Sequence, residues 1–177
     1  MNELHESKNI ERGVNIVSKI SPCLWFDGQA EEAAKLYTSL FPDSRIDKVN
    51  RSPGDTPAGP EGSVLTVDFT IAGQPFIGLN GGADFKFNEA VSFSIDCEDQ
   101  AEVDKYWDAL IAGGGEASQC GWLKDQFGVS WQVVPKQLSE YLEGSDPDGA
   151  RRAMEAMLKM TKLEVEPLRE AYEGARV

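Results

Sequence analysis

Residues 19–42 read KISPCLWFDGQAEEAAKLYTSLFP and contain the unit from which the fold follows. Residues 19–26 form an apolar run typical of a strand, and Asp27-Gly28 interrupts this run. Apolar residues then recur at helical spacing as far as Phe41, which predicts an amphipathic helix that Pro42 ends. The stretch therefore predicts a strand followed directly by a helix.

Three further strands are expected before residue 80. Residues 45–51 are compatible with a strand, and they lead into the Pro- and Gly-rich loop 52–62, SPGDTPAGPEG. Residues 63–71 (SVLTVDFTI) and 75–79 follow, separated only by the short turn Ala72-Gly73-Gln74. Because this turn is so short, the last two strands should form a hairpin.

The same order of elements begins again at residue 90. Residues 90–96 (AVSFSID) alternate like a strand, and Asp99 with Glu102 resembles a capping box at the start of a second helix. The glycines at 113–115 end this helix, and short strands fit within 116–124 and 128–135.

A repeated tripeptide supports this duplication. Gln29-Ala30-Glu31 opens the first helix, and Gln100-Ala101-Glu102 opens the second helix 71 residues further along. The match in element order is stronger than the match of three residues. We therefore predict an α+β fold of two βαβββ modules.

The ends of the chain differ from this duplicated region. Residues 1–17 are predicted to be a flexible N-terminal extension, residues 18–135 the paired domain, and residues 136–177 a C-terminal helical extension. The extension packs either on its own domain or on a second subunit, to which methionines would adapt well. Its main apolar stripe consists of Ala150, Ala153, Met154, Met157 and Leu158, and a last short helix is expected at about 165–172.

The 177 residues carry a formal net charge of −13, with 30 acidic and 17 basic side chains. Because such a surface repels phosphate backbones and anionic lipid heads, nucleic acid and membranes are not expected as partners. The three cysteines, Cys23, Cys97 and Cys120, are too few and too scattered for a disulfide framework. A reducing compartment, the cytoplasm, is expected.

Three stretches together resemble a known family: 21–37 (SPCLWFDGQAEEAAKLY), 120–135 (CGWLKDQFGVSWQVVP) and 150–160 (ARRAMEAMLKM). They resemble the PhnB-like branch of the vicinal oxygen chelate superfamily, which includes glyoxalase I, dioxygenases and bleomycin-resistance proteins. Members of the branch often bear the description 3-demethylubiquinone-9 3-methyltransferase. The resemblance implies a curved half-barrel sheet around a cavity, frequently in a homodimer.

The superfamily's enzymes usually hold a divalent metal through histidines and glutamates on the cavity-facing strands. The resemblance places the four ligand positions at Pro22, Gly78, Ala90 and Gln132, where only the glutamine offers a side-chain oxygen. The single histidine, His5, lies in the polar extension. We therefore expect no metal and no cofactor.

Strand alternation divides the strand residues between the cavity and the helices. Trp25, Phe93 and Trp131 are expected to pack against the helices, whereas Asp125 is either at the cavity mouth or a turn residue. Gln132 is expected to hydrogen-bond to a ligand or to a neighbour such as Ser92. The residues expected to bind a small molecule are Pro22, Leu24, Gly78, Asn80, Ala90, Ser92, Trp122 and Gln132.

Three functional hypotheses remain. The leading one is a small-molecule-binding protein of this fold without the usual metal ligands. A second is an enzyme of the superfamily, a lyase, dioxygenase or methyltransferase, although neither Gly81-Gly82 nor Gly113–Gly115 lies between a strand and a following helix, as S-adenosylmethionine sites require. The third is a protein-interaction scaffold. The sequence leaves open whether the protein is an enzyme.

Overall fold

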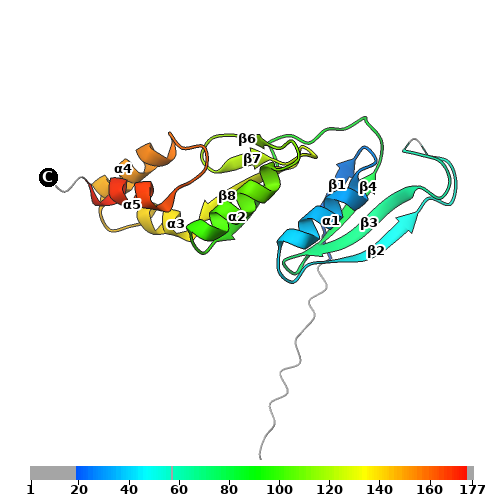
Figure 1. The fold of residues 1–177 in the computed structure, drawn as a ribbon, viewed down its shortest axis with the longest axis horizontal. Helices are drawn as coiled ribbons and strands as arrows, with labels where there is room; N and C mark the ends of the chain where they lie inside the picture. Colours follow the sequence, from blue (N-terminus) through cyan, green and yellow to red (C-terminus); the bar gives the residue numbers. More distant parts are fainter. Residues whose placement is uncertain (1–18, 57, 175–177) are drawn as a thin grey trace, which may run out of the picture.

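The computed structural model describes residues 19–56 and 58–174, whose strands form two four-stranded sheets (Figure 1). The predicted N-terminal extension, residues 1–17 with His5, lies outside the described residues. The first sheet has the order β1-β4-β3-β2 and the second β5-β8-β7-β6. The elements of these two halves are β1 (Cys23–Phe26), α1 (Ala30–Leu40), β2 (Arg45–Arg51), β3 (Val64–Ile71), β4 (Gln74–Asn80), β5 (Phe93–Cys97), α2 (Gln100–Ile111), β6 (Glu116–Ala117), β7 (Trp122–Lys124) and β8 (Ser130–Pro135).

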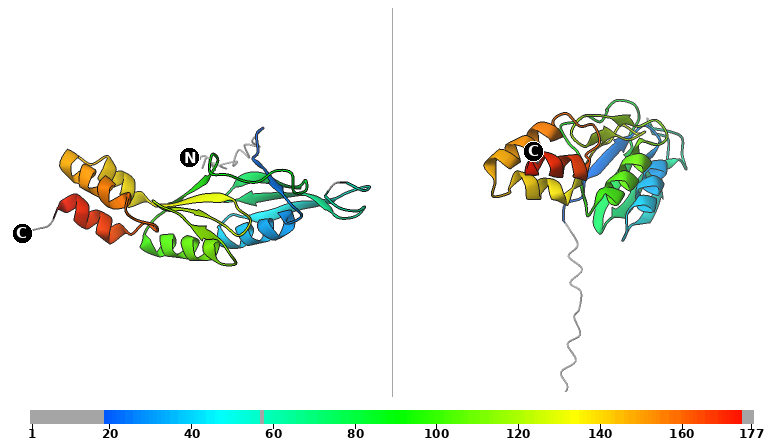
Figure 2. Two further views of the ribbon diagram at one scale, coloured as in Figure 1. Left: turned by 90° about the horizontal axis from the view of Figure 1, so that it is seen from above. Right: turned by 60° about the vertical axis from the view of Figure 1, so that its left-hand side comes forward.

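Both halves have the same topology. In each, the first strand is followed by a helix and pairs in parallel with the last strand, β1 with β4 and β5 with β8. The views in Figure 2 place α1 and α2 on the same side of the two sheets. The predicted pair of βαβββ modules is confirmed, and the described strands do not close into a barrel. We call the sheet face turned away from these helices the open face.

The two helices begin with different polar contacts. At α2 the N-cap contact of the predicted capping box is present, because the Asp99 carboxylate accepts from the Glu102 amide at 3.0 Å. The Glu102 carboxylate accepts from the amide of Glu98, one residue before the N-cap, at 2.8 Å. At α1 the amide of Ala30 donates instead to Oδ1 of Asn80 at 2.9 Å. Asn80 therefore satisfies a helix terminus from the end of β4.

The main core lies between the sheets and their helices and continues from one half to the other. The ring of Tyr37 on α1 meets Trp131 of β8, with centroids 5.3 Å apart. Phe41, just after α1, stacks on Tyr106 of α2 at 4.8 Å. Aromatic contacts are favourable beyond the area they bury, so these rings help to hold the halves together.

One buried carboxylate, Asp125, joins the halves within this core. The Tyr37 hydroxyl and the indole nitrogen of Trp131 donate to its Oδ2 at 2.7 and 2.9 Å. The amides of Phe127 and Val129 donate to its Oδ1 at 2.9 and 3.0 Å. Burial raises the pKa of Asp125, and the four hydrogen bonds oppose that rise. Asp125 is therefore a buried turn residue and does not lie at the mouth of a cavity.

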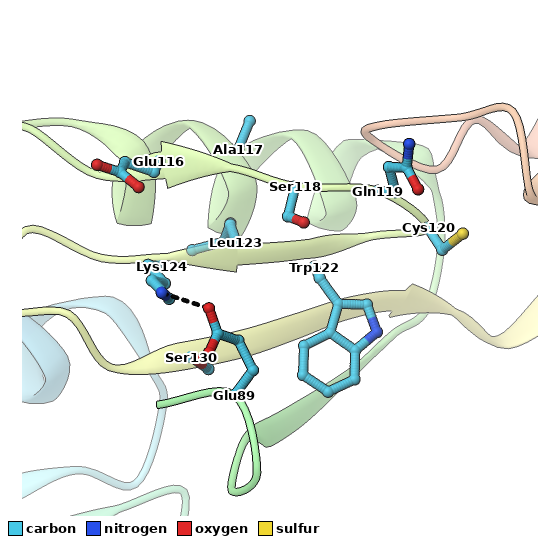
Figure 3. Close-up of a pocket in the computed structure, with 10 residues that line it drawn as sticks. All are labelled: Glu89, Glu116, Ala117, Ser118, Gln119, Cys120, Trp122, Leu123, Lys124 and Ser130. Carbon is cyan, nitrogen blue, oxygen red and sulfur yellow. Dashed lines mark ion pairs between the residues drawn. The ribbon is translucent and has the colours of Figure 1, made fainter. Parts of the chain in front are cut away.

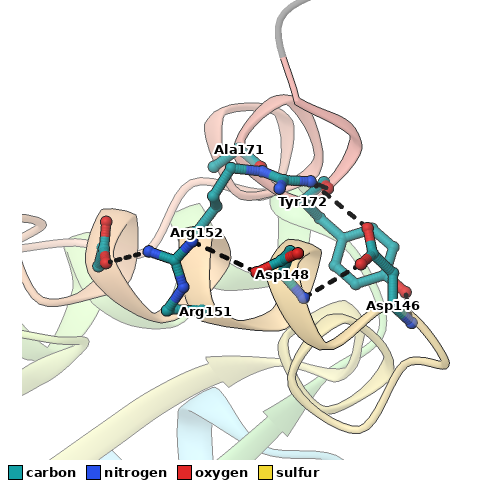
Figure 4. Close-up of polar contacts among 7 residues, drawn as sticks. Asp146, Asp148, Arg151, Arg152, Ala171 and Tyr172 are labelled. Atoms are coloured by element: carbon teal, nitrogen blue, oxygen red, sulfur yellow. Dashed lines mark hydrogen bonds and ion pairs between the residues drawn. The ribbon is translucent and has the colours of Figure 1, made fainter.

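Between Pro135 and the last described residue, Gly174, the chain forms three helices, α3 (Lys136–Leu142), α4 (Pro147–Met157) and α5 (Val165–Glu173). They surround a small core of Leu138, Leu163 and Leu168. Figure 4 shows the side chain of Arg152 reaching α5, where its guanidinium donates to the carbonyl of Ala171 at 2.9 Å. This contact satisfies a carbonyl near the helix end.

These helices pack on their own second half. The amides of Cys120 and Gly121 donate to the carbonyls of Met160 and Thr161, each at 2.8 Å. Met154 and Leu158 remain 40% and 56% exposed. Within the described residues, no helix combines the length and the apolar character needed to cross a membrane.

One strand begins later than expected. β5 starts at Phe93 and not at Ala90, because the amide of Ala90 donates to the Asn88 side chain at 2.9 Å. Ala90 therefore lies in the segment that joins the two halves, residues 81–92, which we call the linker.

Candidate ligand-binding site

The open face of the second sheet carries a group of polar and aromatic side chains. In β8 the side chains of Trp131 and Val133 are buried on the helix side, so Gln132 points to the open face. Trp122 pairs with Gln132 in the register of β7 and β8. Lys124 and Ser130 form the next such pair on the same face.

A cavity of about 470 Å³ opens over this group (Figure 3). Its volume lies within the range of small-molecule sites. The Trp122 ring forms an apolar wall, and the linker supplies Glu89 beside it. The residues lining the cavity are Glu89, Glu116, Ala117, Ser118, Gln119, Cys120, Trp122, Leu123, Lys124 and Ser130.

Among the described residues that line this cavity, Lys124 is the one lysine, and its charge is neutralised by the protein itself. The Lys124 ammonium forms an ion pair with the Glu89 carboxylate, drawn as a dashed line in Figure 3. The hydrogen bond between them lowers the pKa of Glu89 and raises that of Lys124. Glu116, the partner of Lys124 across β6 and β7, raises the Lys124 pKa further.

Ser130 is the most deeply buried polar residue lining the cavity, with 2% of its surface exposed. Its hydroxyl has no hydrogen-bond partner among the described residues. A buried hydroxyl without a partner costs free energy, about 1–3 kcal/mol. Such a group is unusual in a folded protein and needs an explanation.

Gln132 and Ser92 form the expected contact. Nε2 of Gln132 donates to the Ser92 hydroxyl at 2.9 Å. Ser92 also lines a second cavity, of about 590 Å³, where the end of the first-half hairpin meets β5. Gln132 therefore lies between the two cavities.

In the first half, the structure turns the expected cavity residues towards α1. Leu24 is buried with the core, and a Cβ added at Gly78 would lie 3.1 Å from Cβ of Ala30. Asn80 binds the start of α1 as described above. The sequence therefore assigned the residues of β1 and β4 to the wrong faces of the sheet, an error of one residue in the alternation. Trp25, which was expected to pack against α1, points away from it.

The remaining expected residues lie outside the strands. Pro22 is half-buried just before β1, and Ala90 is exposed in the linker beside Glu89. The structure thus brings Ser92, Trp122 and Gln132 together on one open face, while Leu24, Gly78 and Asn80 lie under α1 in the other half.

Sequence reasoning missed Glu89, Lys124 and Ser130. The last two follow from the same alternation, since Lys124 is two residues after Trp122 and Ser130 two residues before Gln132. Glu89 lies outside any strand, so no periodicity indicates it.

The residues at the superfamily's usual metal positions do not fit a divalent metal. Gly78 faces α1 and Ala90 lies in the linker, and neither has a ligating side chain. Within residues 19–56 and 58–174, no three His, Cys, Asp or Glu side chains lie together in a way that could hold a metal ion.

The paired βαβββ modules with their helices on one side define a glyoxalase-like protein of the vicinal oxygen chelate superfamily. The chain belongs to the family described as 3-demethylubiquinone-9 3-methyltransferase, whose model matches residues 18–134. A comparison with curated proteins found no match.

Solved structures agree with this assignment. A Bacillus cereus protein described as a putative 3-demethylubiquinone-9 3-methyltransferase, PhnB protein, is 36% identical, with a TM-score of 0.60 over 67% of this chain and 99% of that chain. Protein PA1353 from Pseudomonas aeruginosa is 20% identical, with a TM-score of 0.55 over 67% and 97%. The fosfomycin resistance protein FosX from Mesorhizobium loti is 13% identical, with a TM-score of 0.52 over 73% and 99%. The last two likenesses concern the fold alone.

Proposed function

We propose that this protein binds a small organic molecule on the open face of its second sheet. The observation that carries the proposal is the cavity of about 470 Å³, with the Trp122 ring on its wall and within it the Ser130 hydroxyl, which has no hydrogen-bond partner among the described residues. Ligand sites commonly combine an aromatic wall with a few polar groups that orient the ligand. Gln132, the cross-strand partner of Trp122, lies next to this wall, and its side chain is held by Ser92.

The family description favours a second candidate, a methyltransferase. Its cofactor would be S-adenosylmethionine, for which a glycine-rich turn between a strand and a helix is the usual site on a doubly wound sheet. Here Gly81-Gly82 leads from β4 into the linker, and Gly113–Gly115 follows α2. We therefore expect S-adenosylmethionine to bind weakly or not at all, and a calorimetric dissociation constant in the low micromolar range would favour the methyltransferase.

A screen of neutral aromatic fragments, read by ligand-observed NMR, tests the binding proposal. Gln132→Leu should keep the fold and weaken a fragment found in the screen by about tenfold, the loss expected for one hydrogen bond. Trp122→Leu removes the aromatic wall and should weaken binding of the same fragment at least as much. Ser94→Ala is the control, since Ser94 pairs with Gln132 but lines the other cavity.

Two outcomes would contradict the proposal. If no fragment binds at millimolar concentration, the scaffold hypothesis is favoured. If both variants bind as well as the parent, the ligand occupies another part of the surface.

We further propose a cytoplasmic homodimer. The exposed Met154 on α4 and Leu158, directly after α4, offer an apolar patch that a second copy would cover. Light scattering at micromolar concentration should give twice the chain mass of 19.4 kDa, and Leu158→Glu should shift it towards the monomer. A monomer in the parent would contradict this part of the proposal.

A further inference from the structure

The pocket on the second sheet contains a carboxylate that the protein itself supplies. Glu89 reaches from the linker to Lys124, and the side chains of the two residues are 62% and 34% exposed. An ion pair this exposed contributes little to folding, because water and salt screen it. Glu89 can therefore leave Lys124 at little cost to the fold.

The neighbouring hydroxyl of Ser130 would gain a partner from an incoming acceptor. Lys124 and Ser130 face each other across β7 and β8, and both line the cavity (Figure 3). An ammonium offers three donors and a hydroxyl offers one, whereas a carboxylate is an acceptor only. The pair is thus suited to the two oxygens of one carboxylate.

The shape of the pocket adds a second requirement. The Trp122 ring lies beside Glu89 in Figure 3, on the same wall of the cavity. A flat apolar group attached to the carboxylate would lie against this ring, in the manner of aromatic pairs.

We infer that the pocket binds a small aromatic carboxylate, and that the Glu89 carboxylate occupies the position of the ligand carboxylate when no ligand is bound. The ligand carboxylate displaces Glu89 from Lys124 and accepts a hydrogen bond from Ser130. This inference rests on the proposed function and specifies the chemical class of its ligand. Glu116 stays beside Lys124 in both states, and its charge weakens the binding of any anion at the site.

The test compares benzoate with its neutral counterpart benzamide by calorimetry on the full chain. Glu89→Gln removes the competing carboxylate and should tighten benzoate binding about fivefold or more. Lys124→Gln should weaken benzoate about tenfold or more, and Ser130→Ala about threefold or more. Benzamide should change less than twofold in Glu89→Gln and Lys124→Gln.

A matched control breaks an exposed ion pair of the same kind elsewhere. Glu98→Gln removes the partner of Lys136 at the far end of β5 and should leave benzoate binding unchanged. Thermal unfolding of every variant checks that the fold is intact.

The outcomes separate this inference from the binding proposal. Benzoate binding that is no tighter in Glu89→Gln, or that does not depend on Lys124, overturns the inference. If benzamide and other neutral fragments bind while benzoate does not, the inference fails and the binding proposal stands. If no compound binds to any variant, both fail.

Discussion

The two halves share a topology but treat their open faces differently. In the first half β2 has seven residues, and the polar side chains of its sheet pair with one another: Asn50 donates to Thr66 at 2.9 Å, and Thr70 donates to Asp47 at 2.7 Å. In the second half the corresponding strand, β6, has two residues. There Ser130 has no partner among the described residues, and Lys124 is held only by exposed acids.

The two halves are thus alike on the faces that their helices cover and differ on their open faces. The helix-covered faces of both halves are apolar and joined in one core, because any loss of packing there destabilises the whole protein. On the open face of the first half, polar side chains hydrogen-bond to one another. On the open face of the second half, the Ser130 hydroxyl has no hydrogen-bond partner among the described residues. A binding site is therefore expected in the second half.

The largest expected effect concerns the carboxylate that joins the halves. Asp125→Ala leaves the Tyr37 hydroxyl and the Trp131 indole nitrogen without their acceptor, together with two backbone amides. Since each buried unsatisfied group costs about 1–3 kcal/mol, we expect a loss of about 3 kcal/mol or more in the free energy of unfolding. Urea unfolding measures it.

Two further variants sharpen this result. Tyr37→Phe removes one of the four donors and should cost less, about 1.5–3 kcal/mol. Asp84→Ala, in the exposed part of the linker, should change little. If Asp125→Ala were as stable as the parent, the halves would be held by aromatic packing alone.

The second effect tests the strand register of the first half. Gly78→Val adds a branched side chain where a Cβ alone would lie 3.1 Å from that of Ala30. Overpacking of this kind costs about 1–3 kcal/mol. The control is Gly54→Val, because a Cβ added at Gly54 meets nothing within 4 Å. If Gly78→Val were tolerated as well as the control, Gly78 would face the open side, as the sequence had suggested.

That register error shows how far the sequence could lead. The element order and both modules followed from periodicity, because helices and strands bury their apolar residues at different spacings. In β8 the polar Gln132 lies between the apolar Trp131 and Val133, and this alternation indicates which residues face the helices. In β4 apolar residues occupy both faces, as in Phe76, Ile77 and Leu79, so alternation gave no direction.

The sequence predicted site residues that lie on or beside the strands, and it missed a residue that lies outside them. Gln132 was found from the family resemblance together with strand alternation, and Trp122 from its place beside the turn that leads to the strand of Gln132. Glu89 was not, because its place depends on how the linker crosses the sheet, which tertiary packing decides. The unmet hydroxyl of Ser130 is likewise a property of three-dimensional neighbours and leaves no sequence pattern.

The smallest expected effect is the pH dependence of the contact between the halves. Burial raises the pKa of Asp125 in the folded state above its unfolded value, which is about 3.9. The folded protein then binds this proton more readily than the unfolded chain, so the contribution of Asp125 to stability grows as pH falls through its folded pKa. We expect the difference in unfolding free energy between the parent and Asp125→Asn to shift in favour of the parent from pH 7 down to pH 4. Urea unfolding of both proteins at each pH measures this difference, in which the other carboxylates cancel. A shift in the opposite direction would show that the four donors around Asp125 outweigh its burial and hold its pKa below the ordinary value.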